Sequence, residues 1–180
     1  MRWAALLRGV NVGRGNRVAM ADLRAVVAGA GYTEVGTVLA SGNLVLTTKT
    51  RLKPESLAIR LEELLGASLK LKARVTAIEA GAFAQVLAER PRAFAAADGS
   101  RLLVGFPRAA GALAKLAPLA SRAWTPAALA VTPHAAWLWC PNGVLADALF
   151  DEVNKLVRDD LTTRNWNTVL KLHTALGSEP

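Results

Sequence analysis

Apolar positions in the first 76 residues switch between the spacing of strands and the spacing of helices. An unbroken apolar run is typical of a short buried strand, apolar residues every three or four positions predict a helix, and strict alternation predicts a strand. Ser41-Gly42-Asn43 supplies turn residues between two of the strands, which predicts an antiparallel hairpin. The predicted elements are a strand over 2–8, a helix over 20–30, strands over 33–39 and 44–48, a helix over 54–66 and a strand over 69–75.

The order strand-helix-strand-strand-helix-strand is that of the ferredoxin-like fold, an antiparallel sheet with both helices on one face. The same order partly recurs in the rest of the chain. Its predicted elements are a helix over 79–90, a strand over 102–106, a helix over 109–120, strands over 127–132 and 135–140, a helix over 144–158 and a final helix from Trp166. We therefore expect an α+β protein of two ferredoxin-like subdomains with antiparallel sheets, 1–76 and 77–180, the second packed against the first.

The composition is that of a globular protein that needs no metal or disulfide to fold. The chain has 180 residues, 52% of them hydrophobic, and a chain of this size buries roughly 70% of the surface that its unfolded form exposes. Cys140 is the single cysteine, which excludes an internal disulfide and fits a reducing compartment. The apolar start of the chain is too short for a signal peptide, and no run approaches the ~20 apolar residues of a membrane span. We therefore expect a cytoplasmic protein that makes no membrane contact.

Positive charge is concentrated in the first half of the chain. The net charge is +8, of which residues 1–76 carry +7 (12 basic and 5 acidic side chains) and residues 77–180 carry +1 (10 and 9). This asymmetry suggests an anionic partner, either nucleic acid or a phosphorylated ligand. The alternative is a general enrichment in arginine, which outnumbers lysine by 15 to 7.

Two stretches near opposite ends of the chain carry a resemblance to a known family. The first is Ala5-Leu6-Leu7-Arg8-Gly9-Val10-Asn11-Val12-Gly13, continued by Met20-Ala21-Asp22-Leu23-Arg24 and by Ser41-Gly42-Asn43. The second is Thr162-Thr163-Arg164-Asn165-Trp166-Asn167-Thr168-Val169-Leu170-Lys171-Leu172. On these motifs the chain resembles the bacterial family catalogued as domain of unknown function 1697. The resemblance implies two ferredoxin-like subdomains and brings no established activity.

The signatures of the common catalytic sites are absent from the sequence. Gly13-Arg14-Gly15 is not a dinucleotide fingerprint, because Val18 stands where the third glycine belongs. No P-loop, His-Glu-x-x-His helix or Gly-x-Ser-x-Gly elbow is present, and His134 and His173 lie far apart in the sequence. Cys140 falls in an alternating pattern that is typical of a small buried hydrophobe. We therefore expect a non-catalytic protein with no cofactor and no metal.

The predicted strand over 69–75 separates apolar from basic side chains. In a ferredoxin-like sheet this last strand pairs with the first, so five cations would line the open face of the sheet, where RNA-recognition domains bind single strands. The alternative is that these lysines protect a sheet edge from aggregation. The apolar set is Leu69, Leu71, Ala73 and Val75, and the basic set is Lys70, Lys72 and Arg74, together with Arg2 and Arg8 of the first strand.

Two polar segments, 11–17 and 162–167, are candidates for a small-ligand site. The first is a loop with arginines, and the second precedes the last helix, where a capping side chain would leave N–H groups for an anion. The alternative is that Asn11 and Asn165 satisfy buried loop backbone and that Trp166 fills the core. The candidate ligand-binding side chains are Arg8, Asn11, Arg14, Arg17, Ser41, Asn43, Arg164, Asn165 and Asn167.

Our leading hypothesis is a non-catalytic protein that binds single-stranded nucleic acid on the basic sheet face. Trp137 and Trp139 share one face of a strand, where they form either a base-stacking platform or core. The rival hypothesis is an enzyme or sensor that holds a small phosphorylated ligand in a cleft between the 11–17 and 162–167 loops. A third is an interaction module whose open sheets pair in a homodimer. An open basic sheet would favour nucleic acid, and an enclosed cleft would favour a small ligand.

Overall fold

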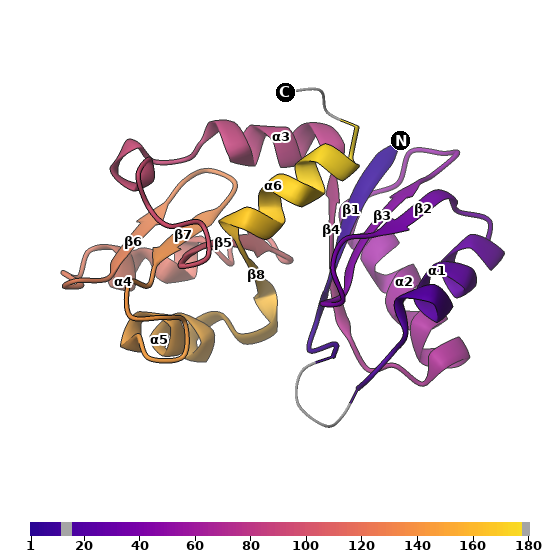
Figure 1. Ribbon diagram of the computed structural model, residues 1–180, viewed down its shortest axis with the longest axis horizontal. Coiled ribbons are helices and arrows are strands. Elements are labelled where there is room, and N and C mark those ends of the chain that lie inside the picture. The colour runs from indigo at the N-terminus through magenta and orange to yellow at the C-terminus, as the bar shows by residue number, and fades with distance from the viewer. Residues whose placement is uncertain (12–15, 178–180) are drawn as a thin grey trace. The chain divides into compact units, whose positions relative to one another are not determined.

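The computed structural model describes residues 1–11 and 16–177 and divides the chain into two compact units (Figure 1). The first unit contains Met1–Ala84 and the end of the chain from Lys171, and the second contains Gln85–Leu170. The expected division after residue 76 falls inside strand β4 (Arg74–Glu79), which pairs with β1 (Arg2–Arg8) over its whole length. The first unit therefore continues beyond β4 and ends inside helix α3 (Ala80–Ala88).

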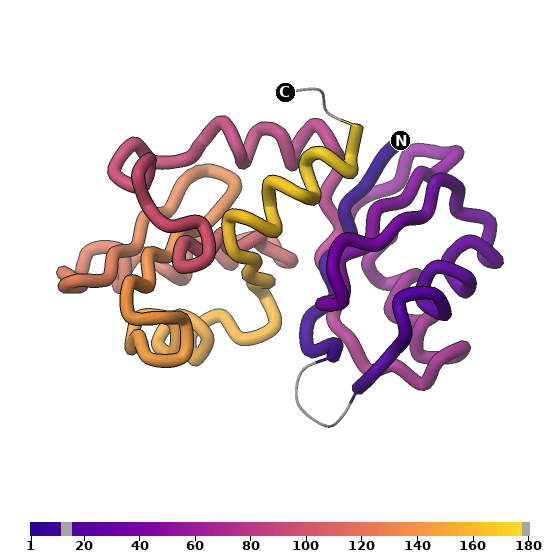
Figure 2. Tube along the Cα trace, in the orientation of Figure 1, coloured from indigo at the N-terminus to yellow at the C-terminus, as the bar shows by residue number. Residues whose placement is uncertain are grey.

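The first unit has the ferredoxin-like order of elements. Between β1 and β4 it contains α1 (Met20–Gly29), β2 (Thr33–Thr37), β3 (Asn43–Thr47) and α2 (Pro54–Leu69). The strand order is β2-β3-β1-β4, and every pair is antiparallel, so the predicted hairpin between β2 and β3 is confirmed. In Figure 2 the trace of β1 runs between those of β3 and β4.

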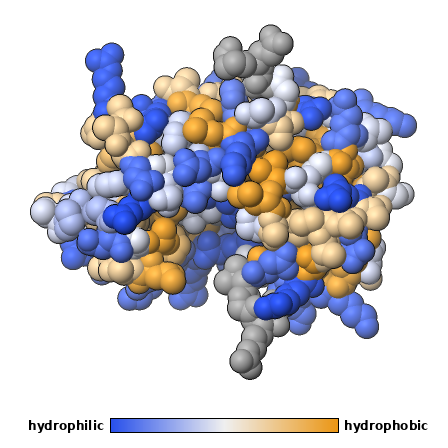
Figure 3. Space-filling view, viewed as in Figure 1, coloured by the Kyte–Doolittle hydropathy of each residue, from blue (hydrophilic) through white to orange (hydrophobic). Residues whose placement is uncertain are grey.

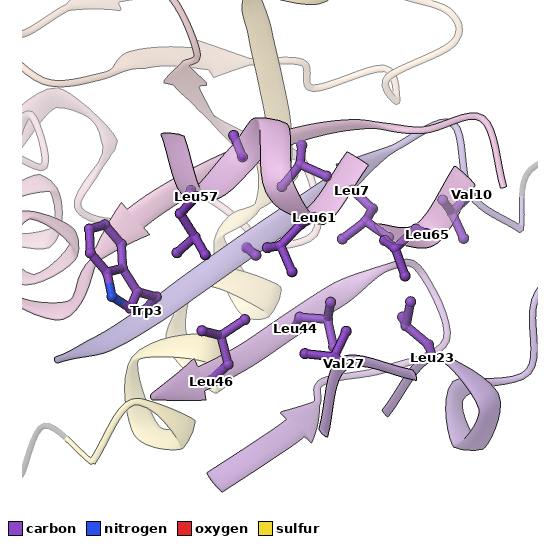
Figure 4. Close-up of a cluster of buried hydrophobic side chains, with 14 of the residues drawn as sticks. Trp3, Leu7, Val10, Leu23, Val27, Leu44, Leu46, Leu57, Leu61 and Leu65 are labelled. Carbon is purple, nitrogen blue, oxygen red and sulfur yellow. The ribbon is translucent and has the colours of Figure 1, made fainter. Parts of the chain in front are cut away.

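The core of the first unit lies between one face of this sheet and the two helices (Figure 4). Alternate residues of β1 and β3 point toward the helices, and apolar residues at helical spacing on α1 and α2 point toward the sheet. Each fully buried leucine of such a cluster contributes roughly 1.5–3 kcal/mol relative to an exposed one. The cluster includes Trp3, Leu7, Leu44, Leu46, Leu23, Val27, Leu57, Leu61 and Leu65.

The second unit repeats the topology of the first. Its strands are β5 (Leu102–Pro107), β6 (Ala128–Val131), β7 (Ala136–Trp139) and β8 (Leu161–Asn165), in the order β6-β7-β5-β8 with antiparallel pairs. Helix α5 (Ala148–Val157) lies between β7 and β8, and α6 (Trp166–Ala175) follows β8. The expected α+β fold with two ferredoxin-like subdomains is therefore confirmed.

Two expectations for the second unit differ from the structure. The segment expected as a helix over 109–120 contains a 3-10 turn at Ala114–Leu116 and a short helix α4 (Ala117–Ala120). The segment expected as a loop over 162–167 is β8 and the first turn of α6. β8 pairs with β5 along its full length, because its threonines suit an extended backbone and Leu161 enters the core of this unit.

The second face of the first sheet is buried rather than open. Ala4 and Leu6 of β1 have no exposed surface. The end of α6 belongs to this unit, and its Ala175 carbonyl accepts a hydrogen bond from Arg2 at 2.7 Å. The expected open basic face is therefore wrong, because the apolar run from Trp3 to Leu7 puts apolar side chains on both faces of the central strand.

Helix α2 continues past Gly66 to Leu69, so the expected strand over 69–75 is also wrong. Lys70 adopts the left-handed conformation (φ 53°), and its N–H donates to the Gly66 carbonyl at 3.1 Å, which is an αL-type helix end. The alternation of exposure nevertheless follows the sequence pattern. Lys70, Lys72 and Arg74 are exposed, Leu71 and Val75 are buried, and Leu69 is half-buried.

The surface seen in Figure 3 is a mosaic of hydrophilic and hydrophobic side chains. In the part of the chain that the structure describes, the large hydrophobic side chains exposed to solvent are Leu39, Ile59, Val131, Leu145, Leu156 and Leu170. No helix over residues 1–11 and 16–177 has the length and apolar character needed to cross a membrane.

Candidate anion-binding rim

The Asn16 side chain joins its own loop to a segment that lies 56 residues further along the sequence. Its amide nitrogen donates to the Gly9 carbonyl at 2.8 Å and to the Lys72 carbonyl at 2.6 Å. Its amide oxygen accepts from the Lys72 N–H at 3.0 Å. These three hydrogen bonds hold the end of the loop after β1 against the segment that leads into β4. We call this arrangement the Asn16 clamp.

Asn11 holds the same loop to the hairpin between β2 and β3. Its amide nitrogen donates to the carbonyls of Val18 at 3.0 Å and Ala40 at 2.7 Å, and its oxygen accepts from the Val18 N–H at 2.9 Å. Asn11 and Asn16 both have φ 55°, a left-handed conformation that asparagine tolerates better than most residues. Both amides therefore have structural partners, which the alternative interpretation expected of Asn11.

The Ser41-Gly42-Asn43 motif is a structural turn. Gly42 has φ 74°, its carbonyl accepts from the Leu7 N–H at 2.8 Å, and a Cβ atom there would lie 2.9 Å from the Leu7 Cβ. Asn43 is fully buried, and its amide donates to the Val38 carbonyl at 2.9 Å and to Ser41 Oγ at 3.0 Å. Only glycine fits this turn without strain, and Asn43 fixes its shape.

The Asn16 clamp gathers basic side chains from three segments. Arg8 precedes Gly9 and is the register partner of Arg74, so these two side chains are cross-strand neighbours. Arg17 follows Asn16, and Lys70 and Lys72 lie on the other side of the clamp. We call this set the basic rim: Arg8, Arg17, Lys70, Lys72 and Arg74. Arg14, which belongs to the predicted site, lies outside the described residues.

One carboxylate moderates the charge of the basic rim. Glu62 of α2 accepts from the Val75 N–H at 2.7 Å and lies 3.4 Å from Arg74. Arg74 is exposed, so this ion pair adds about 0–1 kcal/mol to stability. Glu62 therefore neutralises part of the positive charge at the end of β1.

Arg2 does not join the basic rim. It lies at the opposite end of β1 and pairs with Glu34 at 3.0 Å. A hydrogen bond from Thr47 and the charge of Arg2 lower the pKa of the Glu34 carboxyl below its usual value. The five cations expected on one sheet face therefore fall in two places, because Lys70 and Lys72 precede β4 and Arg2 is about 20 Å of extended strand from Arg8.

N–H groups at the start of α6 donate to acceptors within the protein. Asn165 caps the helix, its side-chain oxygen accepting from the Thr168 N–H at 2.9 Å, and the Asn167 N–H donates to the Gly99 carbonyl at 3.3 Å. Arg164 donates to the Thr163 carbonyl at 2.8 Å. The capping side chain expected here is thus Asn165, and the N–H groups of Asn167 and Thr168 have acceptors within the protein.

The remaining candidate side chains include two buried tryptophans, the half-buried Trp139 and a buried thiol. Trp3 and Trp137 are buried, and Trp137 contacts Trp166 with ring centroids 5.6 Å apart. Burial and the nearby Asp147 raise the pKa of the Cys140 thiol to about 12. Across residues 1–11 and 16–177, the His, Cys, Asp and Glu side chains form no group of three that could hold a metal ion.

These features define an α+β protein of two ferredoxin-like units, the first of which carries a basic rim. A family model described as "Protein of unknown function (DUF1697)" matches residues 1–137. The chain belongs to this family, as the resemblance in its motifs predicted. No curated protein matches the chain.

A solved structure supports the fold independently. The chain is similar to "conserved bacterial protein SP0830 from Streptococcus pneumoniae", with a TM-score of 0.77 and 22% sequence identity. The match covers 97% of this chain and 98% of that one. At this identity the likeness shows that the fold is shared.

Proposed function

We propose that this protein binds single-stranded nucleic acid through its phosphates, at the basic rim rather than on a sheet face, and that it does so in the cytoplasm without catalysing a reaction. The observation that carries the proposal is the Asn16 clamp, which gathers cations from segments far apart in sequence. A fixed group of cations attracts a polyanion because each phosphate contact releases condensed counterions.

The form of the rim favours phosphate contacts over base contacts. Its cations come from two loops and from the ends of β1 and β4, and a flexible single strand can bend its backbone to meet them. Trp3 is buried in the core, so it cannot stack on a base. We therefore expect binding with little sequence preference, because phosphate contacts carry little base information.

The salt dependence of binding tests the proposal. Three to five phosphate contacts give a log–log slope of roughly −2 to −3.5 for a single strand. Reversing Lys70, Lys72 and Arg74 to Glu should flatten the slope by about 2 and weaken all sequences alike. The measurement is a fluorescence-anisotropy titration with a short labelled oligonucleotide at several salt concentrations.

Two further variants separate the rim from general charge. The matched control reverses Arg51, Lys53 and Arg92 to Glu, which removes the same charge at exposed positions outside the rim and should leave the slope unchanged. Asn16→Gly keeps every cation and permits the left-handed backbone but removes the clamp, so it should weaken binding. Equal loss in both triple variants would reduce the proposal to non-specific attraction, and no binding at low salt would refute it.

A further inference from the structure

A second basic site lies in the first unit, away from the basic rim. A hollow of about 190 Å³ opens between the end of α1, the turn after β3 and one side of α2. Ala30 and Gly31 follow α1, Lys49 and Thr50 belong to the turn, and Arg60 comes from α2. Because Thr48 adjoins Met1 by a hydrogen bond, this hollow lies near the start of β1, whereas the rim lies at its end.

Two backbone N–H groups and the Thr48 hydroxyl beside the hollow already have partners within the protein. The N–H groups of Ala30 and Gly31 donate to carbonyls of the last turn of α1, at 3.0 to 3.3 Å. Thr48 Oγ1 accepts from Trp3 Nε1 at 3.0 Å and donates to the Thr50 carbonyl at 2.9 Å. These groups are therefore engaged within the protein, which leaves ligand contacts to the side chains at the mouth of the hollow.

Three side-chain donors at the hollow are not engaged in this way. Over residues 1–11 and 16–177, the side chains of Tyr32, Lys49 and Arg60 make no hydrogen bond or ion pair. Lys49 and Arg60 are exposed, so each retains its charge and its hydration at the mouth of the hollow. Two unpaired cations and a phenol hydroxyl at one opening are complementary to an anion with several acceptor oxygens.

The rest of the wall is apolar. Ala30, Leu52 and the ring of the half-buried Tyr32 supply carbon surface beside the two cations. The volume is smaller than the roughly 300–1,000 Å³ of pockets that enclose drug-sized ligands. We propose that this hollow binds a small phosphate monoester, with its phosphate on Lys49 and Arg60 and its apolar group against Tyr32 and Leu52.

The test uses phenyl phosphate as the probe, with inorganic phosphate and phenol as comparisons. Amide chemical shifts of the ¹⁵N-labelled full chain are followed by NMR during each titration. We expect saturable shifts centred on Gly31 and Thr50 with phenyl phosphate, weaker binding of inorganic phosphate and no shifts with phenol. Lys49→Gln with Arg60→Gln should weaken phenyl phosphate at least tenfold, and Tyr32→Phe should weaken it several-fold.

The matched control is Arg51→Gln with Lys53→Gln, which removes two cations of the same turn that do not line the hollow. This variant should bind phenyl phosphate as the unaltered protein does. An equal loss in both double variants would mean that bulk charge and not the hollow attracts the probe, which overturns the proposal. Shifts confined to the basic rim, or no saturation at millimolar probe, would overturn it as well.

Discussion

Two asparagines and one lysine of the first unit have left-handed backbone conformations, but their side chains differ in the contacts they make. Asn11 and Asn16 occupy left-handed conformations and use them to turn their amides back onto loop backbone. Lys70 occupies a similar conformation at the end of α2, but no hydrogen bond from its side chain is found in the described residues. Its backbone is held in place by the helix end alone, so the strain at Lys70 has no local compensation.

Glycine at position 70 should therefore stabilise the protein. Lys70→Gly removes the clash between Cβ and the backbone at φ 53° while keeping the backbone hydrogen bonds of the helix end. We expect the free energy of unfolding to rise by about 0.5–1 kcal/mol, measured by urea denaturation. Lys72→Gly, in the same exposed segment, serves as the control and should not raise stability. A decrease for Lys70→Gly would mean that the lysine stem packs in a way that outweighs the strain.

Cys140 should be inert in the folded protein. Its thiol is fully buried, and its pKa of about 12 leaves almost no thiolate at neutral pH. We expect no reaction with a maleimide at pH 7.5 until denaturant is added, and then complete labelling. Rapid labelling of the native protein would show that β7 and the segment after it open readily. The labelled mass gives the extent directly.

At the scale of elements, the sequence predicted order and pairing better than it predicted ends. Long apolar periodicities placed β1, α1, β2 and β3 within a few residues, and the Ser41-Gly42-Asn43 turn set the hairpin. The prediction of a strand over 69–75 is wrong, because a helix end followed by a loop can alternate in exposure as a strand does. Gly66 was expected to stop α2, but tertiary packing of Leu65 and Leu71 carried the helix to Leu69.

The candidate site was predictable only in part. The motifs indicate Arg8, Asn11 and Arg17. Nothing in the sequence indicates a role for Asn16, because amide hydrogen bonds across 56 residues leave no local signal. The apolar run from Trp3 to Leu7 did carry a warning against an open sheet face, since an open face requires polar residues at alternate positions. The sequence pattern does not predict β8, because a five-residue strand with one apolar side chain resembles a loop.

The hairpin between β6 and β7 is tied to the end of α3 by one carboxylate. Glu89 accepts from the His134 N–H at 3.1 Å and also contacts the His134 ring. Burial raises the pKa of Glu89, but hydrogen bonds from His134 and Thr132 outweigh this, so the pKa lies below its ordinary value of 4.5. A lowered carboxyl pKa gives stability that is present above pH 4.5 and is lost as pH falls through the folded pKa.

Glu89→Gln should therefore reduce the loss of stability as the pH falls into the acidic range. The variant lacks the titrating group, so its stability should fall less than that of the unaltered protein between about pH 5 and pH 3. Thermal unfolding followed by circular dichroism over this range provides the measurement. Glu152→Gln, at an exposed carboxylate of the same unit, is the control and should lose stability as the unaltered protein does. Parallel curves for Glu89→Gln and the unaltered protein would contradict the assignment.

At the scale of the whole molecule, the two units are interleaved along the chain. The first unit takes residues from both ends of the sequence, and the second is formed by the residues between them. Helix α6 contributes to both, since the division falls between Leu170 and Lys171. The buried face of the first sheet therefore depends on the final residues of the chain.

Substitutions along α6 should show this dependence. Leu172 is fully buried and Leu170 is 42% exposed on the same helix. We expect Leu172→Ala to lower the free energy of unfolding by about 2–5 kcal/mol and Leu170→Ala to change it by less than about 0.5 kcal/mol. Chemical denaturation measures both. Similar small effects for the two variants would mean that the end of α6 adds little to the first unit.

The buried second face of β1 also orders events during synthesis. Ribosomes make Leu172 well after Ala4 and Leu6, at about 5–20 residues per second. For the many seconds in between, β1 through β4 can pair, but one side of their sheet lacks the segment from Lys171 onward. A nascent chain of this protein thus carries an unshielded apolar surface until α6 has been made, and this surface is a natural target for chaperones that act on growing polypeptides.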